Sequence, residues 1–188
     1  MFCYWSANMF DDVLKFWFDP ATRRNWFEAS SEFDELVRQR LGSLHAEAVE
    51  GRLDHWKDSP DGALALCILL DQVPRNMFRG TAHAFATDAL ACAVARHILA
   101  LGFDRSYATD DHRLFCYLPF EHSEDIEDQR LAVRLFSERT ANALTTEYAR
   151  RHLEVITRFG RFPHRNAVLG RTSTAAELEF LNTPGSSF

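Results

Sequence analysis

Apolar residues recur three and four positions apart along most of the chain, which predicts amphipathic helices. The clearest such helix follows Ser31, which with Asp34 resembles a capping box, and it ends at Gly51. Its apolar face consists of Phe33, Leu36, Val37, Leu41, Leu44 and Ala48. An earlier helix, capped by Asn8, is predicted to run to about Phe18.

One later helix is apolar on every side. Ser59 is a favourable cap and Pro60 suits the first helical position, so a helix is predicted to begin there. From Ala63 to Leu70 every residue is apolar, and a helix without a polar face must be buried all round. We therefore expect the domain to pack around this helix, and we expect Pro74 to end it.

Further helices are predicted from the same kind of pattern. One runs from about Ala82 to Leu101 and stops at Gly102, and another runs from about Thr146 to Phe159. Three more begin at caps, namely a helix from Thr109 to Pro119, a helix after Ser123, and a short helix opened by the capping box Thr174–Glu177 before Pro184.

The sequence predicts an all-α fold. No stretch keeps a two-residue alternation of apolar and polar positions, and no hairpin turn signal is present. Short turns between the helices favour antiparallel helix pairs, arranged as a bundle or an irregular α-solenoid. No shift in composition marks a boundary, so residues 1–188 are interpreted as one domain.

Composition narrows the classes of function. The formal net charge of −6 is the opposite of the basic footprint of a general nucleic-acid binder. Four scattered cysteines without a Cys-x-x-Cys pair, and the lack of a signal-peptide pattern, indicate a cytoplasmic protein. The longest apolar run is too short to cross a bilayer, so we expect no membrane association.

Three polar segments interrupt the helical pattern and are candidates for a functional site. They are residues 71–80, 119–125 and 158–171, each of which contains a proline beside charged side chains. Polar groups at turns often carry function. We expect the three segments to converge on one cleft.

Arginines dominate these segments. The group consists of Arg75, Arg79, Arg158, Arg161, Arg165 and Arg171. Guanidinium groups that converge without matching acids would bind a phosphate or a carboxylate. The alternative is that they pair with Asp71, Glu121, Glu124 or Asp125 in a network that locks the turns.

Histidines and amides accompany the arginines. His122 and His164 are candidates for proton transfer, with Glu121 or Asp71 as the carboxyl partner. Asn76 and Asn166 each follow an arginine beyond a proline, and they either orient a ligand or bond the backbone of their own turn. A metal site from His122, Glu124 and His164 lacks a diagnostic spacing, so no metal and no cofactor are predicted.

Five blocks of the chain, taken in order, resemble the domain-of-unknown-function 924 family. The blocks are Val13–Phe18, Leu70–Asn76 with Phe78–Thr81, Ala84–Asp88, Leu118–Glu124 and Arg158–Asn166. The resemblance covers about Val13 to Phe180 and implies a fold similar to tetratricopeptide-like helical arrays, although the tetratricopeptide consensus is absent. The family brings no established activity with it.

Two functions remain open at this point. In the first, a cleft lined by arginine, histidine and acids binds an anionic small molecule and uses general acid–base chemistry, so that the protein could be an enzyme. In the second, the protein is a tetratricopeptide-like interaction module whose polar turns are structural clamps. A homo-oligomer or a protein partner is left open.

Overall fold

The computed structural model describes residues 9–186, and within that range it contains helices and turns but no β-strand, which confirms the all-α fold. The α-helices are α1 (Met9–Trp17), α2 (Pro20–Arg23), α3 (Ser31–Val49), α4 (Pro60–Cys67), α5 (Val73–Met77), α6 (Asp88–Leu101), α7 (Asp110–His122), α8 (Ile126–Arg139), α9 (Ala143–Phe159) and α10 (Ala175–Leu181). The tetratricopeptide-like arrangement stays a prediction.

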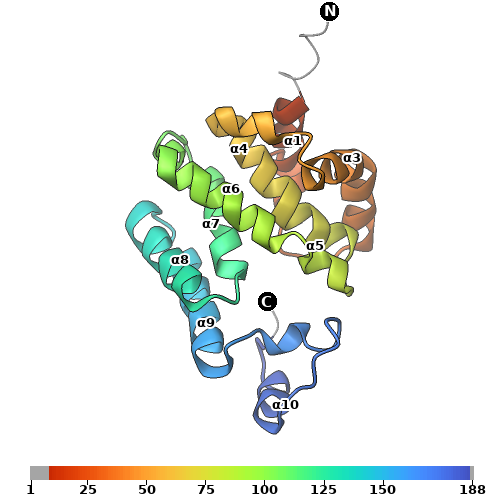
Figure 1. Cartoon of the computed structure of the whole chain (residues 1–188), viewed down its shortest axis with the longest axis vertical. Helices are drawn as coiled ribbons and strands as arrows, with labels where there is room; N and C mark the ends of the chain where they lie inside the picture. Colours follow the sequence, from red (N-terminus) through yellow and green to blue (C-terminus); the bar gives the residue numbers. More distant parts are fainter. Residues whose placement is uncertain (1–8, 187–188) are drawn as a thin grey trace, which may run out of the picture.

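Helix α4 lies within the upper half of the molecule, where α1, α6 and α7 pack against it (Figure 1). The pairs α7–α8 and α8–α9 are joined by short turns and pack along one another. The C-terminal part, with α10, forms the other end of the molecule (Figure 1). This arrangement places the carboxyl end of α7 between the α4-centred half and the C-terminal part.

The apolar helix predicted from Ala63 to Leu70 is fully buried, as expected. It begins as the sequence indicates, because Pro60 occupies the first turn and the Ser59 hydroxyl accepts a hydrogen bond from the Gly62 amide. Gly62 is required here for space, since a Cβ atom would lie 2.3 Å from the carbonyl oxygen of Trp56. The core around this helix contains most of the large buried side chains.

The prediction that Pro74 ends this helix is wrong. The chain passes from α4 through a π-helical turn, Ile68–Gln72, directly into α5. Proline removes one amide and crowds the carbonyl four residues earlier. The wider turn accommodates it, and the Thr87 hydroxyl donates a hydrogen bond of 2.5 Å to the carbonyl of Leu70. A side chain thus supplies the hydrogen bond that Pro74 cannot.

The same correction applies to Pro119, which lies inside α7 rather than at its end. Helix α7 continues to His122, so Glu121 and His122 are helical residues and not turn residues. The side-chain amide of Gln129, which is fully buried, closes this helix end. Its Nε2 donates to the carbonyl oxygens of Glu121 (2.6 Å) and Ser123 (2.7 Å).

Other predicted boundaries shift by a few residues. The cap of α3 is Ser30 instead of Ser31, and the cap of α8 is Asp125 instead of Ser123, because in each case that side chain accepts the first amides. Helix α9 begins at Ala143, with Asn142 as its cap, and not at Thr146. Gly102 and the capping box at Thr174 are confirmed. The predicted cap Asn8 lies outside the described residues.

The predicted helix from Ala82 to Leu101 is divided in two. A 3-10 turn covers Ala82–Phe85, and α6 begins only at Asp88. By length and composition, this segment is the one candidate membrane span among residues 9–186. A core helix meets the same criterion, and α6 buries Ala91, Val94, Ala95 and Ile98 in the core.

Candidate functional site

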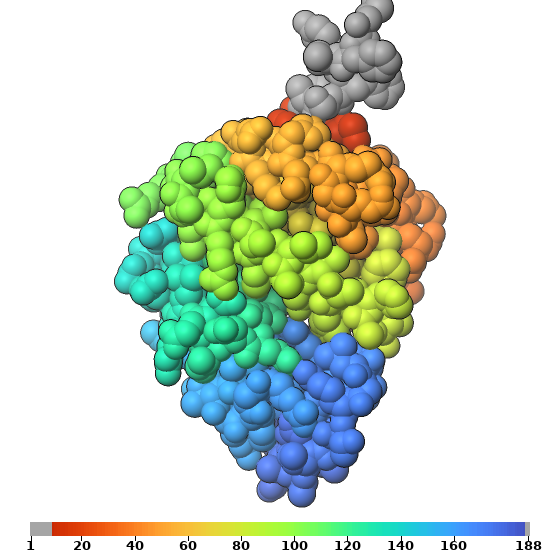
Figure 2. Space-filling model, viewed as in Figure 1, coloured from red at the N-terminus to blue at the C-terminus, as the bar shows by residue number. Residues whose placement is uncertain are grey.

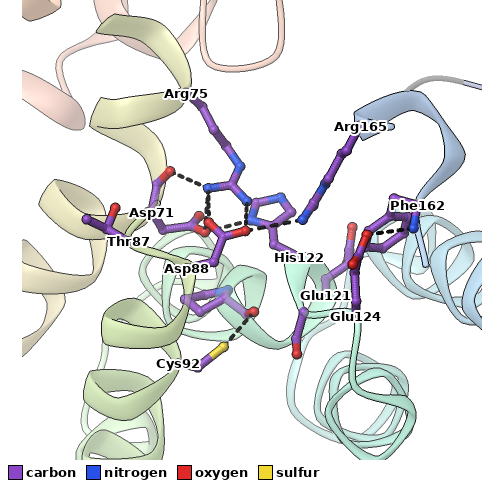
Figure 3. Close-up of polar contacts among 12 residues, drawn as sticks. Asp71, Arg75, Thr87, Asp88, Cys92, Glu121, His122, Glu124, Phe162 and Arg165 are labelled. Atoms are coloured by element: carbon purple, nitrogen blue, oxygen red, sulfur yellow. Dashed lines mark hydrogen bonds and ion pairs between the residues drawn. The ribbon is translucent and has the colours of Figure 1, made fainter. Parts of the chain in front are cut away.

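The three polar segments meet in space, as the sequence analysis expected. They come together at the π-helical turn, the start of α6, the carboxyl end of α7 and the loop after α9 (Figure 3). We call the group that they form the charge centre, and it consists of Asp71, Arg75, Asp88, Glu121, His122, His152 and Arg165.

The first element of the charge centre is a carboxylate–imidazole pair. The Nδ1 atom of His122 lies 2.7 Å from Oδ1 of Asp71, whose side chain is 1% exposed. Burial alone would raise the pKa of Asp71, but Arg75 and His122 hold that pKa well below its usual range. Burial and the nearby Arg75 charge lower the pKa of His122, against the opposing effect of Asp71. The imidazole is therefore neutral at pH 7, and its bond to Asp71 leaves Nε2 for another partner.

The second element is the adjacent pair of Glu121 and His152. Oε1 of Glu121 lies 3.2 Å from Nδ1 of His152, which also donates to the carbonyl oxygen of Tyr148 at 2.9 Å. Burial, with a contribution from the charge of Asp71, raises the pKa of Glu121 to about 8. Burial lowers the pKa of His152 to about 3. Both groups are therefore uncharged at neutral pH, and Glu121 retains a proton that it can donate.

Asp88 joins the two arginines of the charge centre. Arg75 donates to both carboxylate oxygens of Asp88, at 2.8 and 3.1 Å, and also lies 3.1 Å from Oδ1 of Asp71. Nη1 of Arg165 donates to Asp88 at 3.2 Å. This carboxylate therefore holds α5 and the loop after α9 against the start of α6.

Arg165 is the most enclosed of the six arginines singled out from the sequence. Its side chain is 7% exposed, and its guanidinium carbon lies 4.5 Å from the ring centre of Phe85 and 4.4 Å from that of Phe162. Burial and the charge of Arg75 lower the pKa of Arg165 to about 10, so it still carries its charge at pH 7. Its Nε atom is buried and has no hydrogen-bond partner among the residues described.

Several predicted site residues face other partners. Arg79 forms a two-pronged pair with Asp34 on α3, and Arg161 forms one with Glu177 on α10. The guanidinium of Arg158 lies 4.6 Å from the ring centre of Phe159. These three arginines are therefore held outside the charge centre.

The predicted amides bond within their own segments. Asn76 donates to the carbonyl of Gln72, and its Oδ1 accepts a bond from Arg79. Asn166 donates to Ser173 and accepts a bond of 2.9 Å from Nε of Arg171. Asn76 therefore bonds the backbone of its own segment, whereas the side chain of Asn166 bonds two side chains of the loop after α9.

His164 lies beside the charge centre. Its ring centre is 5.6 Å from that of Phe162, and the side chain is partly buried. Burial and the charge of Arg165 lower its pKa to about 4. His164 is therefore a second neutral imidazole near the group, on the loop that carries Arg165.

Sequence reasoning missed several members of the site. Asp88 follows Thr87 at a helix start, where an acid has a sufficient local explanation. His152 falls at a helical position, where packing or solvation is the simpler interpretation, and Phe85 resembles an ordinary apolar residue. A possible signal was the i, i+4 spacing of Asp71 and Arg75 at the end of an apolar helix, which points to a buried pair that needs further partners.

The cleft expected at the meeting point of the three segments stays a prediction. Two cavities, of about 520 and 430 Å³, lie elsewhere and are lined by other residues. Within residues 9–186 no group of three His, Cys, Asp or Glu side chains is arranged to hold a metal ion. What the charge centre offers is a neutral base on Asp71, a protonated acid beside His152 and a buried cation on Asp88.

Comparison with known proteins places the chain in a family. The model of the family described as "Bacterial protein of unknown function (DUF924)" matches residues 13–185. A solved structure of a protein of unknown function from Agrobacterium tumefaciens is 40% identical, with a TM-score of 0.89 over 94% of this chain and 98% of that one. No curated protein matches the sequence. The chain belongs to the DUF924 family.

Proposed function

We propose that the charge centre binds a small molecule that carries a carboxylate or a phosphate, and that His122 exchanges a proton with it. The observation that carries this proposal is the buried guanidinium of Arg165. Its one hydrogen bond to a described residue comes from Nη1, and Nε has none. A buried donor left without a partner is costly. The Nε–Nη2 edge matches the two-pronged geometry of a carboxylate or phosphate.

The imidazole of His122 supplies the chemistry. Asp71 fixes the ring through Nδ1, so the neutral ring presents Nε2 as a proton acceptor. Glu121 is the next residue on the same helix, and its raised pKa of about 8 keeps it protonated at neutral pH. A base and an acid with pKa values shifted in opposite directions are the usual basis of acid–base catalysis. We therefore propose general acid–base catalysis at this site.

Charge balance adds a consequence. At pH 7 the negative Asp71 and Asp88 match the positive Arg75 and Arg165, while Glu121, His122 and His152 are neutral. A bound anion would leave this buried group with excess negative charge. Protonation of His122 would remove that excess, so ligand binding should be accompanied by proton uptake.

A thermal-shift screen against carboxylated and phosphorylated metabolites tests the proposal. We expect a hit to raise the unfolding temperature of the wild-type protein, and Arg165→Gln to lose that increase. The matched control is Arg79→Gln, because Arg79 is also paired with an aspartate but lies at the surface. The variant His122→Gln should keep binding and lose proton uptake. An equal shift in the wild type and in Arg165→Gln would contradict the proposal.

A second candidate function is supported by the ion pairing of five of the six arginines. Arg75, Arg79, Arg161, Arg165 and Arg171 each face a carboxylate. In this alternative the charge centre is a structural clamp, and a tetratricopeptide-like surface elsewhere binds a protein. It predicts that Arg165→Gln fails to fold and that no metabolite stabilises the wild type. For either function, a cytoplasmic protein without nucleic-acid or membrane partners is the setting that we propose.

A further inference from the structure

The cavity of about 520 Å³ lies at the opposite end of α7 from the charge centre. It is bounded by the turn after α6, the first residues of α7 and the last residues of α8, and its charged lining consists of Asp104, Arg105, Asp110, Arg113, Glu138 and Arg139. Helix α7 rises about 1.5 Å per residue, so this cavity is on the order of 15 Å from His122. It is therefore separate from the proposed site.

Asp104 is the unusual residue of this cavity. It is fully buried, and its Oδ2 accepts hydrogen bonds from the Tyr117 hydroxyl (2.7 Å) and from Nη1 of Arg139 (2.5 Å). Its Oδ1 is buried and has no partner among residues 9–186. Buried carboxylate oxygens nearly always accept a hydrogen bond. Asp104 lines the cavity but its Oδ1 is enclosed there, so an N–H or O–H donor reaches this acceptor when the neighbouring side chains of the lining move.

The arginines around the cavity differ in whether they already have hydrogen-bond or ion-pair partners. Arg113 donates to Asp110 at 3.0 Å and to the carbonyl of Tyr107 at 2.6 Å, and Arg139 is bound to Asp104. Arg105 is exposed at the cavity, and its side chain makes no hydrogen bond or ion pair with the described part of the chain. Arg105 is thus the cation that remains for an anionic group.

The formal charges of the lining cancel. Three acids and three arginines face the cavity, so a ligand with a large net charge would gain little from it. A molecule that carries one positive and one negative group matches the lining better, because each group meets its opposite. The free acceptor of Asp104 fits an ammonium group, and Arg105 fits a carboxylate.

We propose that this cavity is a second binding site, and that it takes a small zwitterion of the free α-amino-acid class. The ammonium group lies toward Oδ1 of Asp104, and the carboxylate lies at Arg105. Binding at this cavity does not depend on the charge centre.

The test uses the full-length protein and the standard free amino acids at about 10 mM as probes, with the unfolding temperature as the readout. At least one amino acid should stabilise the wild type. Its N-acetylated form and its amide should not, since each lacks one of the two charged groups. Binding of the N-acetylated form as tightly as the free amino acid would overturn the proposal, as would the lack of stabilisation by any of the probes.

Protein variants complete the test. Arg105→Gln should weaken binding of the stabilising amino acid by at least about tenfold, because one charged hydrogen-bonding group is lost. This variant should fold normally, since Arg105 is exposed. Arg134→Gln, an exposed arginine on α8, is the matched control and should bind as the wild type does. Unchanged binding in Arg105→Gln would contradict the assignment.

Discussion

The two ends of the molecule are held together by different forces. The half around α4 buries a large apolar cluster that includes Trp17, Trp56 and Phe115. The part after α9 contributes Phe162 and Phe180 to a small apolar cluster, whose other members lie on α8 and α9. Its attachment relies instead on ion pairs, among them Arg165 with Asp88 and Arg171 with Glu124.

This difference explains the position of the charge centre. In Figure 2 the C-terminal part, in blue, meets the segments coloured from lime to teal along one boundary. The charge centre joins residues from both sides of that boundary, with Asp88 on α6 and Arg165 beyond α9. Segments with few buried apolar contacts open at a lower free energy than an apolar core. A ligand could thus reach Arg165 without unfolding the α4-centred half.

The largest expected effect lies in the apolar half. Leu66→Ala should lower the free energy of unfolding by about 4 kcal/mol, because a buried leucine leaves a cavity that the surrounding helices cannot fill. Leu66 is 1% exposed. The control Leu90→Ala, at a position 42% exposed, should change the stability little. Chemical denaturation would measure both, and equal losses would refute the buried role of α4.

The second largest effect is expected from a comparison of two aspartates, each of which binds one arginine through two hydrogen bonds. Asp88 holds Arg75 and Asp34 holds Arg79, each through two hydrogen bonds, but the side chain of Arg75 is 17% exposed and that of Arg79 is 45% exposed. Asp88→Ala leaves two enclosed guanidinium groups without this carboxylate and should cost about 3 kcal/mol. Asp34→Ala should cost less than about 1 kcal/mol. Denaturation curves that gave equal losses would show that burial does not distinguish the pairs.

Glu121 should give the charge centre its own pH dependence. Its pKa of about 8 in the folded protein means that folding retains a proton which the unfolded chain releases at lower pH. Glu121 should therefore contribute a loss of stability as the pH rises from about 4.5 to about 8, by up to about 1.4 kcal/mol per pH unit. The histidines with lowered pKa values act in the opposite direction, because the unfolded chain releases their protons around pH 6.5, so the contribution of Glu121 is measured as the difference between the wild type and Glu121→Gln at each pH. Glu121→Gln should remove this contribution, and an unchanged slope would contradict the assignment.

The smallest effect should be local. Glu124 accepts the Phe162 amide at 2.8 Å and pairs with Arg171, and these contacts hold its pKa below its usual range although burial opposes this. Glu124→Gln should lower the free energy of opening of the loop after α9 by about 1 kcal/mol, without lowering the stability of α4. Native-state hydrogen exchange would measure this. Equal loss of protection in α4 would show that the two ends do not open separately.

Local signals sufficed for much of the fold. Ser59 and Pro60 start α4, Thr174 and Glu177 form the predicted capping box, and the apolar run up to Leu70 is buried. These features depend on residues a few positions apart, so the sequence displays them directly. The meeting of the three polar segments was also expected, and the structure brings Asp71, His122 and Arg165 together.

What the sequence did not reveal depends on distant partners. Pro74 does not stop its helix, because Thr87 supplies the missing hydrogen bond from another segment. Asp88 links Arg75 and Arg165 because the fold brings three segments together, and their distances along the chain do not show this. The sequence also does not show which arginines join the charge centre and which form surface pairs. The residues next to each arginine do not distinguish the two groups.

The most direct measurement is the nitrogen NMR spectrum of the His122 imidazole, assigned by comparison with His122→Gln. The account predicts a neutral ring at pH 7, protonated at Nδ1, because Nδ1 faces Asp71 and the pKa is lowered. Addition of a metabolite found by the thermal-shift screen should shift the Nε2 resonance and protonate the ring. A ring that is already charged at pH 7, or one whose Nε2 resonance does not respond to a bound metabolite, would contradict an acid–base site at the charge centre.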